Sequence, residues 1–440
     1  MKRLKKLFPF IILYIVIFLF NVFLVDNNMD EIWNYGFSLA IRMGEVPYND
    51  YNMVILPFYP ILMSLPLFIF KNYISYIMLH CLFVTFAYYL IFKMYKDRGL
   101  YLLLLAFVLI NCIYANYNVF IFVLIAIVLY LEQSKIKNKD LLIGITIGLS
   151  FLTKQSIGVM LLIPWLIKFK DVNLKKRVIG FLIPNIMCLI YFIIFNNLGN
   201  AIDQCFLGLL DFTGNSKSFD LSSFIIFAVI VIISINICRK KGFTINNLYI
   251  LMSYSIFIPT FDILHSYYLI FFFVLLVISN YEFNRINNKL VFFCVFIGVI
   301  SIIAYGRFND DIGKYPNNFK NYNYKYYPKS GLDYINKVNE YVDSNTIIYD
   351  DTAYVYRIIN NQKIGYLDLV NHGNLGYHSS KKIINELKKN KDKKILVRDD
   401  TGKRTKEYES QLDREGYLYI MKHYKVVDHV LDFSIYEYNK

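Results

Sequence analysis

The chain has 440 residues, of which 56% are hydrophobic and 18% charged, and its formal net charge is +14. A soluble domain carries about 25% charged residues, so this composition argues against an ordinary soluble protein. A basic balance can indicate nucleic-acid binding, but much of the charge lies in short segments between apolar runs, and no nucleic-acid-binding motif accompanies it. We therefore expect no nucleic-acid partner.

Two regions of different composition divide the chain. Residues 1–305 consist mostly of apolar runs, and residues 306–440 are mostly polar. A membrane-spanning helix needs roughly 17–25 apolar residues, and hydropathy predicts about 11–13 spans here. We expect a polytopic α-helical membrane domain over 1–305 and a separate domain over 306–440. The candidate runs are Leu7–Val25, Val54–Phe70, Tyr73–Phe92, Leu100–Tyr114, Val119–Leu131, Leu141–Leu152, Ile157–Ile167, Val178–Phe195, Leu221–Ile237, Leu248–Phe261, Tyr267–Ile278 and Val291–Ala304.

Basic loops predict the orientation of these runs. Met1–Lys6 (MKRLKK) precedes the first run, and Phe23–Asp26 lacks the small residues of a signal-peptide cleavage site, so we interpret a retained span with a cytoplasmic N-terminus. Positive-inside reasoning then places the C-terminal domain on the extracytoplasmic side of the cell membrane. Two apolar runs separate the outer loop at Asp26 from the basic loop at Lys93, where an odd number of crossings is required. Either one run does not span, or one basic loop faces outward.

The first outer loop, Asp26–Tyr51, is long and contains a periodic stretch. Apolar residues recur at helical spacing, which predicts an amphipathic helix over Glu31–Met43 lying in the membrane interface, with Asp30 as its N-cap. A second long outer loop, Asn196–Asp220, predicts another interfacial helix. The residues that carry the first pattern are Ile32, Tyr35, Leu39 and Met43.

Helices and strands alternate after a polar linker at Arg307–Lys329, which predicts a small α/β domain. This domain has neither GxGxxG nor GxxxxGK[ST], so we expect no nucleotide site. The expected helices are Gly331–Val342, Ser380–Asn390 and Thr405–Glu415, and the expected strands are Thr346–Tyr349, Ile364–Leu367, Lys394–Val397, Val426–Leu431 and Ser434–Tyr438.

Asp30 and Glu31 are adjacent carboxylates directly after the first apolar run. A carboxylate at that position can act as a general base on an acceptor hydroxyl. The alternative is structural, because an acidic residue at a helix N-terminus caps it and interacts favourably with its dipole.

Lys154 interrupts a run that is otherwise apolar from Leu141 to Ile167. An ionisable residue at the centre of a membrane helix costs about 2.5–3.5 kcal/mol, and the cost falls at an interface because lysine snorkels. The functional interpretation is a cation that binds a phosphate group. The structural interpretation is a turn between two short helices.

Asp262 and His265 lie in Pro259–His265 (PTFDILH), between two apolar runs. Their spacing places both on one face of a helix, where the carboxylate can orient an imidazole that donates to a phosphate. Alternatively, Asp262 caps the next helix and His265 faces the lipid headgroups.

The remaining candidates are weaker. Arg42, Tyr48 and Tyr59 flank the first outer loop, where they could line a pocket or belong to an aromatic belt. The sequence has no CxxC and no HExxH, so we predict no zinc site. The sequence leaves open whether the protein binds a divalent cation, because Asp203 and Asp211 both qualify as a second loop carboxylate.

Taken in order, these motifs resemble the GT-C superfamily of membrane glycosyltransferases, and within it the protein-mannosyltransferase and aminoarabinose-transferase branch. The resemblance covers roughly residues 1–305, and Gln155 departs from it, since many relatives have proline there. The matching stretches are Asp30-Glu31-x-Trp33-x-Tyr35, Pro47-Tyr48-x-x-Tyr51, Pro57-Phe58-Tyr59-Pro60, Gly144-x-x-x-Gly148-Leu149-x-Phe151-Leu152-Thr153-Lys154-Gln155 and Pro259–His265.

The resemblance implies transfer of a sugar from a polyprenyl-phosphate-linked donor to a cell-envelope glycan, lipid or protein on the outer face of the membrane. It implies Asp30 as the base, and Glu31 as a residue that holds the acceptor or tunes Asp30. Lys154 and His265 would hold the lipid phosphate, because fixed cations stabilise a leaving group that gains negative charge. Direct displacement by the acceptor hydroxyl would invert the anomeric carbon.

Three other functions remain as alternatives. A flippase or transporter of a lipid-linked sugar would show internal hydropathy repeats, which we do not find. A polysaccharide polymerase or ligase usually carries its chemistry in a large late outer loop, whereas the loop that contains Asp262 and His265 is short. A non-catalytic assembly protein would use the C-terminal domain to bind a partner.

Overall fold

The computed structural model describes residues 2–23, 29–70, 72–96, 105, 115–208, 210, 221–257, 263–281, 329–371, 374–407 and 412–439. The chain forms two compact units, each assembled from three separate segments. We call the first the helical unit; it comprises Met1–Asp26, Ile77–Cys188 and Ser218–Tyr315. The second, the composite unit, comprises Asn27–Tyr76, Leu189–Lys217 and Pro316–Lys440. The domain boundary predicted between residues 305 and 306 lies outside the described residues.

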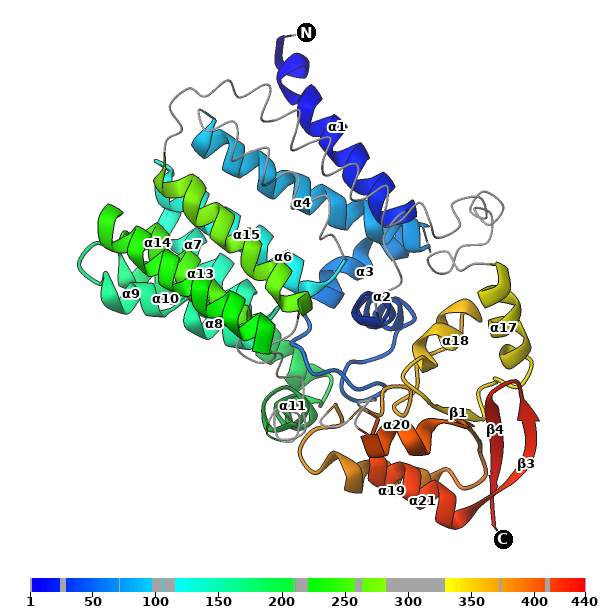
Figure 1. Cartoon of the computed structure of the whole chain (residues 1–440). Coiled ribbons are helices and arrows are strands. Elements are labelled where there is room, and N and C mark those ends of the chain that lie inside the picture. The colour runs from blue at the N-terminus through cyan, green and yellow to red at the C-terminus, as the bar shows by residue number, and fades with distance from the viewer. Residues whose placement is uncertain are drawn as a thin grey trace. The chain divides into compact units, whose positions relative to one another are not determined.

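The helical unit consists of apolar helices (Figure 1). Predicted runs 100–114 and 291–304 lie outside the described residues apart from Leu105, and the described residues of the other runs assigned to this unit are mostly helical. Its elements are α1 (Lys2–Phe23), most of α4 (Tyr73–Tyr95), α6 (Tyr117–Gln133), α7 (Lys139–Phe151), α8 (Gln155–Met160), α9 (Ile163–Ile167), most of α10 (Leu174–Ile194), α13 (Leu221–Lys241), α14 (Ile245–Ser253), the 3₁₀ helix η2 (Tyr254–Phe257) and α15 (Ile263–Asn280).

Within the described residues, α4 and α10 have the length and apolar character needed to cross a membrane. Other apolar helices are shorter, including α3 (Phe58–Phe70), α6 and the segment Gln155–Ile167. The predicted polytopic architecture of about 11–13 spans therefore stays a prediction.

The composite unit is mostly helical and contains one four-stranded sheet. It combines the two long loops of the sequence, α3 and the end of α10 with the C-terminal region. Its elements are α2 (Met29–Arg42), α3, α11 (Leu198–Ile202), the π-helix η1 (Asp203–Leu207), α17 (Lys329–Asn339), β1 (Thr346–Tyr349), α18 (Ala353–Ile359), α19 (Ser379–Lys389), β2 (Lys394–Arg398), α20 (Thr401–Glu407), α21 (Arg414–His423), β3 (Tyr424–Val430) and β4 (Phe433–Tyr438).

The sheet has the order β1-β2-β4-β3, with β1 and β2 parallel and the β3–β4 hairpin antiparallel. Strand residues alternate between faces, and Ile347, Tyr349, Ile395 and Val397 share one face with the core. Helices α19 and α21 lie side by side (Figure 1) and contribute Ile383, Leu387 and Ile420 to that core. The predicted α/β organisation of this region is confirmed.

Two local predictions for the C-terminal region are wrong. Residues 364–367 form a turn instead of a strand, because the Asp368 carboxylate accepts from Gly365 N at 2.6 Å while Asp368 N donates back to Gly365 O at 3.0 Å. The helix predicted over Thr405–Glu415 is replaced by α20 and α21, and Asp413 caps the latter by accepting from Gly416 N at 2.7 Å.

Candidate functional site

Asp30 and Glu31 both lie in the first turn of α2, which begins at Met29. Asp30 is therefore inside the helix and not its N-cap. Its side chain is partly exposed, whereas Glu31 is fully buried. Asn34 reinforces this turn by donating from Nδ2 to Asp30 O at 2.6 Å. The two adjacent carboxylates therefore occupy different environments, and Asp30 is the more accessible of the pair.

Glu31 faces a cluster of tyrosines. The Tyr73 hydroxyl donates to Glu31 Oε1. Tyr35 packs edge-on against Tyr73 and Tyr76, at centroid distances of 5.0 and 5.2 Å. Tyr59 Oη lies 3.5 Å from Tyr76 Oη. These contacts hold Glu31 in a buried aromatic environment, which suits a positioning role.

Helix α2 also packs against the C-terminal region. Gly36 allows this approach, because a Cβ at that position would lie 2.3 Å from the Tyr354 ring. Phe37 meets the same ring edge-on at 5.8 Å. Burial extends around most of α2, so this segment is not a helix with one solvent-exposed polar face in the described structure. The carboxylates are therefore carried by an element that the C-terminal region supports.

The loop after α2 is hydrogen-bonded to the segment that follows α18. Asn52 Nδ2 donates to Tyr366 O at 2.8 Å and to Leu369 O at 2.9 Å. Glu45 Oε2 accepts from Ile364 N at 3.3 Å. Burial raises the pKa of Glu45 to about 7, against the opposing effect of the Ile364 hydrogen bond.

The three predicted pocket residues differ in exposure. Tyr48 is fully buried, and its hydroxyl donates to Ile55 O at 2.8 Å. Tyr59 is fully buried in the tyrosine cluster described above. Arg42 is partly exposed in the last turn of α2, where a cation is favourable for the helix dipole. Their role in lining a pocket stays a prediction.

Lys154 lies in the turn between α7 and α8 and is 8% exposed. Gly158 permits the tight turn, since a Cβ there would lie 2.2 Å from Phe151 Cα. The Lys154 ammonium donates to Asn118 Oδ1 at 2.8 Å and lies 5.5 Å from the centroid of the Tyr117 ring. The structural interpretation of Lys154, a turn between two short helices, is confirmed, and its phosphate-binding role stays a prediction.

Asn116 and Asn118 connect this turn to a third helix. Asn116 caps α6, its Oδ1 accepting from Asn118 N at 2.6 Å. Its Nδ2 donates to the Tyr268 hydroxyl at 3.1 Å. Tyr268 belongs to α15, three residues after His265. A continuous chain of contacts therefore links Lys154 to the helix that carries the predicted histidine.

His265 lies in the first turn of α15, and its side chain is outside the described residues, as is Asp262. Asp30 and Glu31 belong to the composite unit, whereas Lys154 and His265 belong to the helical unit. Convergence of these residues at one cavity therefore stays a prediction. The sequence reasoning missed Asn116, Asn118 and Tyr268; the signal available was a pair of amides, Asn116 and Asn118, directly before an apolar run.

A buried arginine forms another polar cluster in the helical unit. Arg177 is 1% exposed and pairs with Glu132 at 2.7 Å and Asp140 at 2.7 Å. Its Nη1 also donates to the Tyr249 hydroxyl at 2.8 Å. Trp165 Nε1 donates to the same hydroxyl at 2.7 Å. This network joins α6, α7, α9, α10 and α14, and its charge is neutralised by protein carboxylates, so we assign it a structural role.

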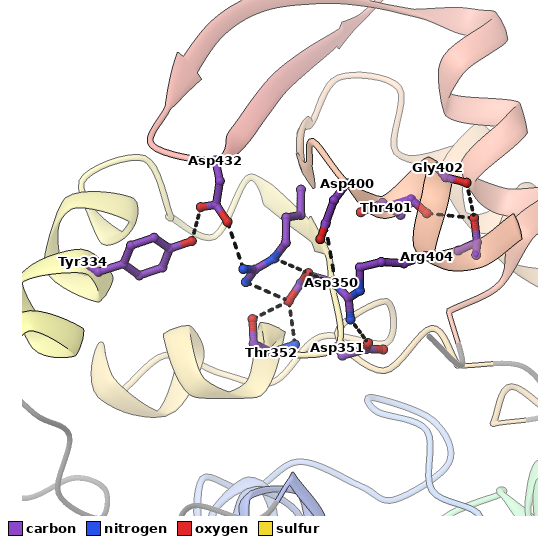
Figure 2. Close-up of polar contacts among 11 residues, drawn as sticks. Tyr334, Asp350, Asp351, Thr352, Asp400, Thr401, Gly402, Arg404 and Asp432 are labelled. Atoms are coloured by element: carbon purple, nitrogen blue, oxygen red, sulfur yellow. Dashed lines mark hydrogen bonds and ion pairs between the residues drawn. The ribbon is translucent and has the colours of Figure 1, made fainter. Parts of the chain in front are cut away.

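A third polar cluster lies at the carboxyl ends of β1 and β2 (Figure 2). Arg398 Nε donates to Asp350 Oδ2 at 3.0 Å, and its Nη1 donates to Asp432 Oδ2 at 2.9 Å. Arg404 Nη2 donates to Asp351 Oδ2 at 2.8 Å. Two guanidinium groups are thus fixed by surrounding carboxylates, and the cluster ties the hairpin and α20 to the parallel strands.

In the part of the chain that the structure describes, no three His, Cys, Asp or Glu side chains come together in a way that could hold a metal ion. Asp203, one of the two loop carboxylates considered above, instead pairs with Lys382 and accepts from Tyr377 N at 3.1 Å. Asp211 lies outside the described residues. Metal use stays open.

No protein-family profile and no curated protein sequence matches the chain. Among solved structures, the chain is similar to an oligosaccharyltransferase of Archaeoglobus fulgidus, crystallised as a complex with Zn and sulfate. The match has a TM-score of 0.41 and 11% identity, and covers 94% of this chain and 71% of that one. A TM-score below 0.5 does not establish a shared fold.

Proposed function

We propose that the protein is a polytopic membrane glycosyltransferase that moves a sugar from a polyprenyl-phosphate donor to an acceptor hydroxyl on the outer face of the cell membrane. The observation that supports this proposal most is the contact chain from Lys154 through Asn118 and Asn116 to Tyr268. It links the turn that carries Lys154 to the helix that carries His265, and these two predicted phosphate-binding residues are more than 100 residues apart in the sequence.

The exposed surface of α10 supports a membrane location. Large apolar side chains are exposed along the helix, and Met187 and Ile194 are 66% and 71% exposed. Monomeric soluble proteins rarely leave extended apolar patches uncovered, whereas lipid covers such a surface without cost. α13 has the same character. Its exposed residues include Leu221, Phe224, Ile225, Ile226, Val229, Ile232 and Ile233.

The length of α3 bears on how many helices cross the membrane between the first outer loop and the basic loop at Lys93. α3 has 13 residues. At a rise of 1.5 Å per residue it is about 20 Å long, against a hydrocarbon core of about 30 Å. We infer that α3 does not cross and that α4 alone does. The loop at residues 26–51 and the basic loop at Lys93 then lie on opposite sides, as the positive-inside rule requires.

The composition of the composite unit supports the proposed orientation. Its three segments contain the two long loops and the C-terminal region, which the sequence predicts to be extracytoplasmic, together with α3 and the end of α10. Polar segments that contact one another without crossing the hydrocarbon core lie on the same side of a membrane. We therefore place Asp30, Glu31 and the C-terminal region together on the outer face.

The environments of Asp30 and Glu31 support different roles for the two carboxylates. A general base must reach the proton that it removes, and the partly exposed Asp30 is better placed for this than the buried Glu31. Glu31, held by Tyr73, would fix the start of α2. Asp30 would take the proton from the acceptor hydroxyl as that oxygen attacks the anomeric carbon, and the lipid phosphate would leave toward Lys154 and His265.

The test is transfer of a radiolabelled sugar from a polyprenyl-phosphate donor by the purified full-length protein in detergent. Removing a general base typically costs about 10²–10⁴-fold in rate. We expect Asp30→Asn to lower kcat by at least about 100-fold while donor binding is retained. Glu31→Gln should reduce activity together with the folded fraction, because it disturbs a buried contact.

Asp50→Asn provides a matched control, since Asp50 is an exposed carboxylate of the same loop whose contact is with Val46 N at 2.7 Å. It should leave kcat within about twofold. Unchanged transfer by a folded Asp30→Asn protein would refute the catalytic assignment. Movement of lipid-linked sugar across vesicles without any transfer would favour a flippase.

A further inference from the structure

We propose that Asn118 is a positioning residue that holds the Lys154 ammonium in place for an anionic lipid phosphate. This inference rests on the proposed function, because it takes Lys154 as the residue that binds the phosphate. It assigns a role to the Asn116-Tyr117-Asn118 stretch at the start of α6. The residues of this stretch contact Lys154 or the helix that carries His265.

The orientation of the Asn118 amide follows from the chemistry of its partner. An ammonium group can only donate hydrogen bonds, so the oxygen of the amide must face it. The contact measures 2.8 Å, and Asn118 is 2% exposed. A lysine has a long flexible stem, and a buried acceptor removes much of its freedom before a ligand arrives.

Asn118 is itself held by the cap of its own helix. Asn116 has extended backbone geometry, and its Oδ1 accepts from Asn118 N. The Nδ2 of Asn116 donates to the Tyr268 hydroxyl, so a displacement of α15 is transmitted to the cap. The Tyr117 ring provides a weaker contact to the same ammonium from the same turn. The position of Lys154 is therefore coupled to α15 through two amides.

The neutrality of the amide matters for this role. A carboxylate in the place of Asn118 would also orient the ammonium, but it would cancel part of the positive charge that attracts a phosphate. Asn118 orients the cation and leaves that charge in place. The chemistry predicts that an aspartate substitution weakens phosphate binding even though it strengthens the contact to Lys154.

The experiment measures the KM for a polyprenyl-phosphate sugar, kcat, and direct binding of sugar-free polyprenyl phosphate to the purified protein. Loss of a hydrogen bond to a charged group typically costs roughly tenfold or more in binding. We expect Asn118→Leu to raise KM and the Kd for polyprenyl phosphate roughly tenfold. Tyr268→Phe should raise KM about two- to threefold, since it removes a neutral contact further along the chain.

Asn118→Asp tests the positioning role through the pH dependence of KM, which a merely structural role would not change. At pH 8 its KM should exceed that of the natural protein, and it should recover as the pH falls and the new carboxyl becomes neutral. Asn21→Leu is the matched control, because Asn21 is a fully buried amide of the helical unit that donates to Ile17 O at 3.1 Å. It should leave the KM unchanged at every pH.

The outcomes of this experiment distinguish failure of the positioning role from failure of the proposed function. Transfer by the natural protein with an unchanged KM in folded Asn118→Leu and Asn118→Asp would overturn the positioning role alone. If the natural protein binds polyprenyl phosphate, weaker binding by both variants supports the role even without detectable transfer. A natural protein that binds no polyprenyl phosphate would overturn the inference together with the phosphate assignment of Lys154.

Discussion

The helical unit buries two cations in contrasting ways. Arg177 lies between two carboxylates and a tyrosine, so its positive charge is neutralised within the protein. Lys154 is held by the amide oxygen of Asn118, which orients the charge without cancelling it. Burial alone therefore does not distinguish the two cations, whereas the chemistry of the groups that contact them does.

The difference in side-chain chemistry agrees with the two proposed roles. Arginine presents a rigid fork of donors, which suits simultaneous contacts with Glu132, Asp140 and Tyr249 from three helices. Lysine presents a compact ammonium with three donors. The first arrangement stabilises a helix assembly, whereas the second suits an anion that binds and leaves.

The largest expected effect is on stability, from Arg177→Leu. Removing one partner of a buried ion pair typically costs about 3–5 kcal/mol, because the remaining charge is left uncompensated. We expect Arg177→Leu to lose stability of that order. The loss should appear as a lower thermal unfolding midpoint of the purified protein in detergent. The double substitution with Glu132→Gln should recover part of the loss. A midpoint equal to that of the natural protein would show that Arg177 is not the structural centre of this network.

Glu45 extends the comparison to a buried acid held by a neutral backbone group. Its pKa is raised from the ordinary value of 4.5 to about 7, so the folded protein binds the proton more tightly than the unfolded chain. The contribution of Glu45 is most favourable below pH 4 and declines as the pH rises toward 7. At about 1.4 kcal/mol per pKa unit, the decline is on the order of 3 kcal/mol.

The measurement for Glu45 is the pH dependence of the unfolding midpoint. Glu45→Gln should lose stability less steeply than the natural protein between pH 5 and pH 7. The charged groups around it are Lys363, Asp50 and Asp368, so Lys363→Met should steepen the decline by removing a favourable charge. Identical slopes in the natural protein and Glu45→Gln would contradict the raised pKa.

Lys154→Met has the smallest expected effect on stability and the clearest effect on function. Replacing a buried ammonium by an apolar side chain of similar length removes a desolvation cost but leaves the Asn118 oxygen without this donor, so the free energy of unfolding should fall by no more than about 1–3 kcal/mol. The KM for a polyprenyl-phosphate donor should rise at least about tenfold, by analogy with other charge-assisted contacts. If Lys154→Met instead unfolds the protein like Arg177→Leu, the contrast between the two cations fails.

The sequence predicted helices and strands correctly where the pattern of neighbouring residues decides the local structure. Periodic apolar residues predicted α2, and two four-residue runs predicted β1 and β2 close to their observed ends. Prediction failed at residues 364–367, where Asp368 and Glu45 take the backbone donors of Gly365 and Ile364. One of these partners lies more than 300 residues away, beyond the reach of any local pattern.

By itself, the sequence determined the apolar character of residues 1–305, the α/β character of the C-terminal region, and the presence of acidic and basic residues at loop positions. Only the tertiary structure decided that the two long loops and the C-terminal region form one unit, that Glu31 is buried while Asp30 is accessible, and that Asn118 holds Lys154. The physical reason is that hydropathy and helical periodicity are local properties of a chain. Burial, and the identity of a hydrogen-bond partner, depend on segments that meet only after folding.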